Sequence, residues 1–348
     1  MIVFRQTVAL MLTAAFLALL SITVAACGQR PLPQYELTGT TMGTTFSVKL
    51  VAPQQDLDLD GMQQDVYVLL ESVDATMSTY RDDSELSRFN ASPGGAWYAV
   101  SPQLCAVVSA ALDISGLTDG AFDVTVGPLV NLWGFGPDGP VSTPPDADTV
   151  ATMRQAVGHD RLFADCARPA LRKSIDDLYV DLSAIAKGFA VDTVAALLDE
   201  SGLANYLVEI GGELRGRGLN ARQEKWAIAI ETPDKSGRSV QKVVHLTDFA
   251  MATSGDYRNY FEYGGRSYSH TIDPRTGYPV HHAGAAVTVI ADTAGYADGM
   301  ATALLVLGPD AGLALAERDR IAAFFLLRQE SGFEERMTTM FADRVSGG

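Results

Sequence analysis

The sequence predicts an α+β fold in which mixed or antiparallel sheets are flanked by helices. Stretches with helical spacing and stretches with strand character are interspersed, without the strict β–α–β alternation that a doubly wound parallel sheet requires. No Gly-x-Gly-x-x-Gly opens a helix after a strand and no Walker sequence occurs, so a nucleotide would bind by another arrangement. The 348 residues, 47% of them hydrophobic, are enough to bury a sizeable core.

Each element is predicted from a local signal. Ser101 followed by Pro102 is an N-cap with proline at the first helical position, and elsewhere apolar residues recur at helical spacing. Helices are expected at 60–77, 102–117, 184–201, 293–307 and 311–318. Strands are expected at 178–182, 206–210, 226–230, 243–246 and 286–290. Four prolines within 137–145 indicate an exposed loop or a joint between subdomains.

The amino terminus has the pattern of a bacterial lipoprotein. Residues 9–26 are almost wholly apolar, a length that could also form a retained membrane helix. Val-Ala-Ala-Cys at 24–27 has the order of a lipoprotein cleavage site. We therefore predict a signal peptide over 1–26, an acylated Cys27 that begins a linker over 27–34, and one domain over 35–348. The domain would face the periplasm or extracytoplasmic side of the cell envelope, held at the membrane by its lipid.

Charge and cysteine content limit the classes of function. The formal net charge is −16, which disfavours binding to nucleic acid or to an anionic lipid surface. An anionic substrate must then be met by a local positive site or by a bound metal. Cys105 and Cys166 suggest no metal pair, and an exported location permits a disulfide between them as well as two buried thiols.

The segment 267–277 carries the densest site chemistry. It combines hydroxyls, the His270 imidazole, a carboxylate and a guanidinium within eleven residues. Its start alternates like a strand, and Asp-Pro-Arg-Thr-Gly at 273–277 is typical of a turn. Such a strand end displays either a functional site or a solvated hairpin tip.

A second segment, 181–192, runs from a strand into a helix. Ser183 is a plausible N-cap, so Ala184 to Lys187 would form a first turn whose N–H groups bind an anion. Lys187 adds a point charge suited to phosphate, although a cation there opposes the helix dipole. The alternative is a surface lysine that tolerates this cost.

Three further segments favour ligand binding less strongly. Asp298 and Thr302 are four residues apart on one helix face, where two hard oxygens suit Mg²⁺; alternatively, Thr302 bonds back to the helix and Asp298 is solvated. Asp-Gly-Ala-Phe-Asp at 119–123 presents backbone groups after a helix end, or is a simple C-cap. Paired glycines within 209–213 allow a close ligand approach or a hairpin, and His281-His282 is interpreted as surface.

Taken together and in this order, these segments resemble the ApbE family of flavin transferases. The matching stretches are 39–44, 78–80, 84–90, 115–136, 180–192, 210–213, 253–256, the strand around His270, and 297–302. The match covers nearly all of 35–348, for which the resemblance implies an ApbE-like, T-fold-related architecture. It also implies Mg²⁺-dependent transfer of FMN from FAD to a Thr or Ser hydroxyl of a partner flavoprotein, through a phosphoester bond and with release of AMP.

The resemblance assigns roles to individual residues. His270 would be the general base and Lys187 would offset charge on the pyrophosphate. FAD would contact Met42, Tyr80, Ala121, Phe122, Asp123, Asp181, Lys187 and Ile272. Mg²⁺ would be held by Asp298, Thr302 and the backbone oxygens of Ala184 and Ala301. The alternatives are a metal-dependent FAD pyrophosphatase that yields FMN and AMP, a non-catalytic FAD-binding lipoprotein, and a purely structural lipoprotein.

Overall fold

The computed structural model describes residues 31–53, 57–233, 239–257 and 259–346. The predicted signal peptide and Cys27 lie outside these residues. Within the described ranges, no helix combines the length and apolar character needed to cross a membrane.

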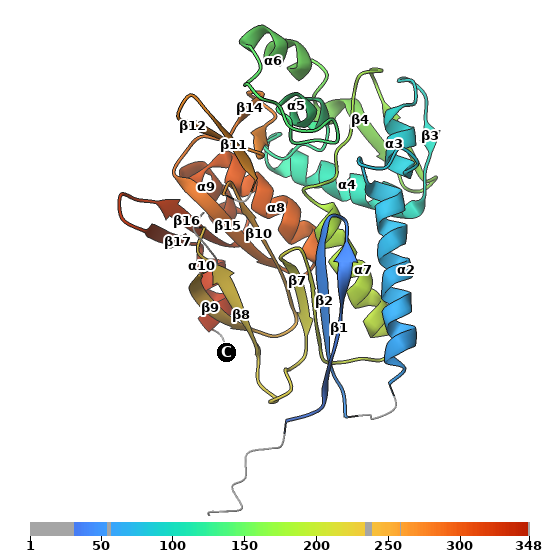
Figure 1. Ribbon diagram of the computed structural model, residues 1–348, viewed down its shortest axis with the longest axis vertical. Coiled ribbons are helices and arrows are strands. Elements are labelled where there is room, and N and C mark those ends of the chain that lie inside the picture. Colours follow the sequence, from blue (N-terminus) through green and yellow to red (C-terminus); the bar gives the residue numbers. More distant parts are fainter. Residues whose placement is uncertain (1–30, 54–56, 234–238, 258, 347–348) are drawn as a thin grey trace, which may run out of the picture.

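An eight-stranded antiparallel sheet forms the centre of the molecule (Figure 1). Its strands, in spatial order, are β1 (Gln34–Thr41), β2 (Thr44–Val51), β6 (Tyr206–Ile210), β7 (Glu213–Arg217), β10 (Phe249–Gly255), β15 (Gly284–Ala291), β16 (Ala322–Arg328) and β17 (Phe333–Met337). Every neighbouring pair is antiparallel. The predicted α+β class, with antiparallel sheet and flanking helices, is confirmed.

Layers cover both faces of this sheet. The helices are α2 (Leu59–Met77), α3 (Glu85–Asn90), α4 (Pro102–Leu117), α5 (Gly127–Leu132), α6 (Ala147–Arg154), α7 (Ala186–Glu200), α8 (Ala294–Leu307), α9 (Pro309–Arg318) and α10 (Thr339–Ser346), with a 3₁₀ turn at His159–Arg161. Helices α7 and α8 pack on one face, with α2 alongside α7 (Figure 1). The ribbon of β8 (Trp226–Glu231) and β9 (Val240–Leu246) covers the other face together with α10.

The central strands are apolar on both sides because both faces are covered. In β16, Ala323 and Phe325 enter the core beneath the helices, whereas Phe324 and Leu326 enter the core beneath β8, β9 and α10. This alternation places successive side chains on opposite faces. The sequence of β16 is therefore continuously apolar because both faces of this strand are buried.

Three small sheets lie around the central one. They are β3 (Tyr98–Ala99), β5 (Ala170–Lys173) and β4 (Leu162–Asp165); β11 (Tyr260–Tyr263) with β12 (Arg266–Ser269); and β13 (Ile272–Asp273) with β14 (Tyr278–Pro279). The hairpin β11–β12 lies beside α5 at one end of the molecule (Figure 1). It leads directly into His270.

Most predicted elements are confirmed, and three sequence interpretations are corrected. Residues 178–182 form no ladder strand; Val180 instead bonds through its N–H and C=O to the Asn90 amide, at 2.8 Å each, so a side chain replaces a neighbouring strand. Ser183 is not an N-cap, since it donates to Asp181 while α7 begins at Ala186. His282 is half-buried, with Nε2 2.8 Å from the Leu305 carbonyl near the end of α8.

Lys173 holds the extended segment that leads toward Asp181. Its side chain is buried, and Nζ donates to the carbonyls of Asn90, Asp176 and Leu178 at 2.6, 2.8 and 3.2 Å. Burial lowers the pKa of this ammonium, because desolvation penalises its charge. The three carbonyls compensate by taking its three N–H donors.

A disulfide joins Cys105 to Cys166 and resolves the alternatives that the sequence leaves open. It ties α4 to the turn between β4 and β5. The loop that it closes contains the segment 121–136, which contributes to the cavity described below.

We expect removal of this disulfide to destabilise the fold. Because the cysteines are 61 residues apart, chain-entropy arguments give a loss of up to about 4 kcal/mol in the free energy of unfolding for Cys105→Ala/Cys166→Ala. Urea unfolding of this variant, the oxidised wild type and the reduced wild type measures the loss. The same unfolding midpoint for all three proteins would contradict the expectation.

Candidate active site

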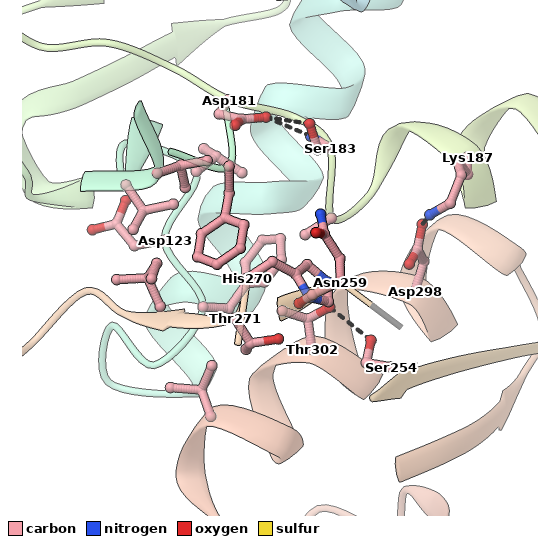
Figure 2. Close-up of a pocket in the computed structure, with 18 of the residues that line it drawn as sticks. Asp123, Asp181, Ser183, Lys187, Ser254, Asn259, His270, Thr271, Asp298 and Thr302 are labelled. Carbon is pink, nitrogen blue, oxygen red and sulfur yellow. Dashed lines mark hydrogen bonds and ion pairs between the residues drawn. The ribbon is translucent and has the colours of Figure 1, made fainter. Parts of the chain in front are cut away.

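A cavity of about 350 Å³ opens between the central sheet, α8 and the segment before α5. Figure 2 shows side chains from these elements converging on it. Most of the predicted site residues line this one cavity: Tyr80, Ala121, Phe122, Asp123, Asp181, Ala184, Lys187, His270, Ile272, Asp298 and Thr302. The fold thus gathers segments that are far apart in the sequence.

Two predicted residues lie elsewhere. Met42 lines a separate groove between the β1–β2 turn and α2, with Tyr67 and Val68. Ala301 is fully buried inside α8, where helical geometry directs its carbonyl to the N–H of Leu305. The structure therefore brings neither Met42 nor Ala301 to the lining of this cavity.

A buried charge cluster forms the polar end of the cavity. Lys187 Nζ lies 3.2 Å from Glu213 Oε1 and 3.9 Å from Asp298 Oδ2. Figure 2 shows the Lys187 side chain pointing toward Asp298. Asp298 Oδ2 also accepts a 3.1 Å hydrogen bond from the backbone N–H of Gly188. Both carboxyl groups are buried, so the idea of a solvated Asp298 is wrong.

Burial and charge set the protonation of this cluster. Burial raises the pKa of Glu213 to about 8 and also raises the pKa of Asp298, while the Lys187 ammonium opposes both shifts. With both carboxyl groups ionised, two negative charges face one positive charge. A divalent cation at Asp298 would correct this imbalance.

The sequence patterns assign no role to Glu213. Its Oε2 is one of three buried side-chain polar atoms in the described residues that have no hydrogen-bond partner. The available signal was the pair of glycines before it, which form the β6–β7 turn with φ of 62° at Gly211 and 108° at Gly212. A Cβ on Gly211 would lie 3.1 Å from Lys187 Cδ, so glycine also leaves room for the lysine stem.

Close packing of α7 on α8 places Lys187 beside Asp298. A Cβ on Gly188 would lie 2.3 Å from the carbonyl oxygen of Ala294, so only glycine permits this approach. Asp192 of α7 then accepts hydrogen bonds from the N–H groups of Ala294 and Gly295, both at 2.9 Å. A carboxylate of one helix thereby caps the N-terminus of the other.

The oxygen donors at α8 fit Mg²⁺. Asp298 and Thr302 both line the cavity, and Thr302 Oγ1 lies 2.8 Å from Ser254 Oγ (Figure 2). In the described parts of the chain, no group of three His, Cys, Asp or Glu side chains is arranged to hold a metal ion. Mg²⁺ is commonly bound by only one or two protein carboxylates, with substrate phosphate and water completing its octahedron. The carboxylate, the hydroxyl and the carbonyl of Ala184 suit such a shared site.

His270 projects into the same cavity immediately after β12. The Asn259 carbonyl lies 3.0 Å from both the backbone nitrogen and Nδ1 of His270. A carbonyl only accepts hydrogen bonds, so Nδ1 carries the hydrogen and Nε2 presents a lone pair. Burial lowers the pKa of His270, which favours the neutral ring.

Two carboxylates brace the backbone around the cavity. Asp123 Oδ1 accepts from the N–H and hydroxyl of Thr125, while Oδ2 accepts from the N–H of His159. The Asp123 carboxylate also raises the pKa of His159. Asp181 Oδ1 accepts from the N–H and hydroxyl of Ser183. Both residues line the cavity; Asp123 has both oxygens hydrogen-bonded, whereas Asp181 has Oδ1 engaged by its own loop.

The other end of the cavity is apolar and suits a planar ring. Its walls are Ala121, Phe122, Val126, Val130, Phe135 and Ile272. Tyr80 is exposed, and its hydroxyl donates to the Phe135 carbonyl at 3.1 Å. An elongated ligand with an aromatic group at one end and an anionic centre would match the two ends.

Comparisons with known proteins agree with this geometry. The ApbE family model matches residues 42–325. A relative from Vibrio cholerae, named FAD:protein FMN transferase, is 46% identical over 329 residues, which are 94% of this chain and 98% of the relative.

Solved structures give the same result. The flavin transferase ApbE from Vibrio cholerae superposes with a TM-score of 0.84 at 45% identity, covering 90% of this chain and 100% of that one. The apo flavinyl transferase ApbE from Pseudomonas stutzeri gives a TM-score of 0.83 at 42% identity, covering 91% and 98%. The family model, the identity and the shared fold together show that the chain belongs to the ApbE family.

Proposed function

We propose that this chain is a Mg²⁺-dependent transferase that moves FMN from FAD to a Thr or Ser hydroxyl of a partner flavoprotein. The observation that carries the proposal is the meeting of His270, Lys187 and Asp298 in one cavity with an apolar end. The printed names of the relatives, FAD:protein FMN transferase and flavin transferase, support the same reaction.

The cavity supplies binding and charge neutralisation for phosphoryl transfer. Lys187, which lines the cavity from the first turn of α7, would face the pyrophosphate with its positive charge. Asp298, Thr302 and the Ala184 carbonyl would hold Mg²⁺, whose charge would stabilise the developing negative charge on phosphate oxygens. The apolar walls would enclose the isoalloxazine ring.

His270 would act on the acceptor. Its Nε2 lone pair accepts the hydroxyl proton, while Nδ1–H remains bonded to the Asn259 carbonyl. The acceptor oxygen then bonds to the FMN phosphorus, and the bond from that phosphorus to the bridging oxygen breaks. AMP leaves with the bridging oxygen. In the pyrophosphatase alternative, water replaces the acceptor hydroxyl and FMN is released.

We expect an acceptor flavoprotein subunit to gain the mass of FMN less water when incubated with this chain, FAD and Mg²⁺. Intact-mass spectrometry and in-gel flavin fluorescence measure the product, and chromatography measures AMP. EDTA should abolish both, because the metal neutralises the pyrophosphate. Free FMN and AMP with an unmodified acceptor would identify a pyrophosphatase, and unchanged FAD would identify a binding protein.

His270→Asn should separate chemistry from binding. Asparagine keeps a hydrogen-bonding side chain but takes no proton at neutral pH, so transfer at saturating FAD should fall by about 10²- to 10⁴-fold. FAD affinity, measured by titration, should change only a few fold. Parallel losses of affinity and transfer would show that His270 orients FAD instead.

The protonation of His270 should determine how the rate of FMN transfer falls at acidic pH. Because burial lowers the pKa of His270 below its ordinary value of about 6.5, the neutral imidazole predominates at pH 6.5. Wild-type transfer should therefore persist at pH 6.5 and decline only at more acidic pH.

The lipoprotein assignment remains a proposal, supported by the sequence at 24–27. Cys27→Ser should abolish incorporation of labelled palmitate and leave either an uncleaved precursor or a mislocalised protein, because serine offers no thiol for acylation. A matched Cys105→Ser variant, altered within the domain, should still be labelled. Label in the Cys27→Ser protein would contradict the assignment.

A further inference from the structure

Glu213 has no role in the reaction as described above, yet it is buried and lines the cavity. Its two oxygens differ: Oε1 lies 3.2 Å from Lys187 Nζ, whereas Oε2 is buried without a hydrogen-bond partner. Burying a carboxylate with one unpaired oxygen carries a desolvation penalty. The position of Glu213 beside Lys187 therefore needs a physical explanation.

The distances around Lys187 indicate that reason. The ammonium is within hydrogen-bonding distance of Glu213 but 3.9 Å from Asp298, beyond the normal range for a hydrogen bond. Lysine is a flexible point charge, and with no competing carboxylate it would move onto Asp298. There it would occupy the oxygens that a cation needs.

We propose that Glu213 is a positioning residue that holds the Lys187 ammonium away from Asp298 and so keeps that carboxylate available to a divalent cation. The inference rests on the proposed function, which assigns the cation to Asp298. This role of Glu213 explains how an ammonium and a divalent cation, which repel each other, can bind the same pyrophosphate at once. Glu213 acts through Lys187 and need not touch the substrate.

The test uses Mn²⁺ alone as the probe, with its affinity measured by electron paramagnetic resonance without nucleotide. At a pH above the raised Glu213 pKa of about 8, Glu213→Gln keeps the shape and removes the charge, so Lys187 should close on Asp298 and weaken Mn²⁺ binding about 10- to 100-fold. Glu213→Asp, which keeps the charge, should recover most of the affinity. Equal Mn²⁺ affinity in wild type and Glu213→Gln would overturn the proposal.

Changing Lys187 distinguishes positioning from simple attraction. If Glu213 acts by holding the ammonium, Glu213→Gln should cost no more than a few fold in a Lys187→Met background. The same 10- to 100-fold loss in both backgrounds would mean that Glu213 attracts the cation directly, and would overturn the proposal. If Lys187→Met does not fold, Lys187→Gln provides the second background. The shift of melting temperature with Mn²⁺ gives an independent readout.

A matched control removes a charge from the same hairpin. Glu209, whose Oε1 accepts a 2.7 Å hydrogen bond from the Gly212 N–H, is absent from the cavity lining. Glu209→Gln should leave Mn²⁺ affinity unchanged, and an equal loss would attribute the effect to net charge. A wild type that binds no Mn²⁺ would reject the cation assignment itself. A wild type that binds Mn²⁺, with Glu213 variants that do not show the predicted changes in affinity, would reject only this inference.

Discussion

The site depends on a buried charge cluster, in which one ammonium lies between two carboxyl groups and contacts one of them. Lys187, Glu213 and Asp298 come from α7, β7 and α8, and burial raises the pKa of both acids. Removing such groups from water is expensive, and the attraction between them compensates only when their geometry is good. The cluster therefore needs a scaffold that fixes three separate elements relative to one another.

The sheet and the close pair of helices provide that scaffold. The tight turn at Gly211 and Gly212 starts β7 with Glu213 facing the cavity, and the absence of a side chain at Gly188 lets α7 approach α8. Asp192 then joins the helices by capping α8, and it receives a 2.6 Å ion pair from Arg215 of β7. The contacts that build the fold are thus the contacts that position the charges.

Much of the site could be predicted from the sequence, because its chemistry lies in short segments. Lys187, His270 and Asp298 stand in recognisable local patterns, and the structure brings them together. Glu213, the Asn259 carbonyl and Lys173 were not predicted, because their roles arise from contacts between distant segments. The same limit explains residues 178–182, whose extended backbone is satisfied by an Asn90 side chain that no local pattern indicates.

The central claim is that the cation and the pyrophosphate meet at this charge cluster. The most direct measurement is anomalous diffraction from crystals of the protein containing Mn²⁺ and FAD. The account predicts an Mn²⁺ peak bounded by Asp298 and Thr302, with the pyrophosphate beside Lys187 and the flavin ring against Phe122 and Ile272. An Mn²⁺ peak away from Asp298, or a pyrophosphate outside this cavity, would contradict it.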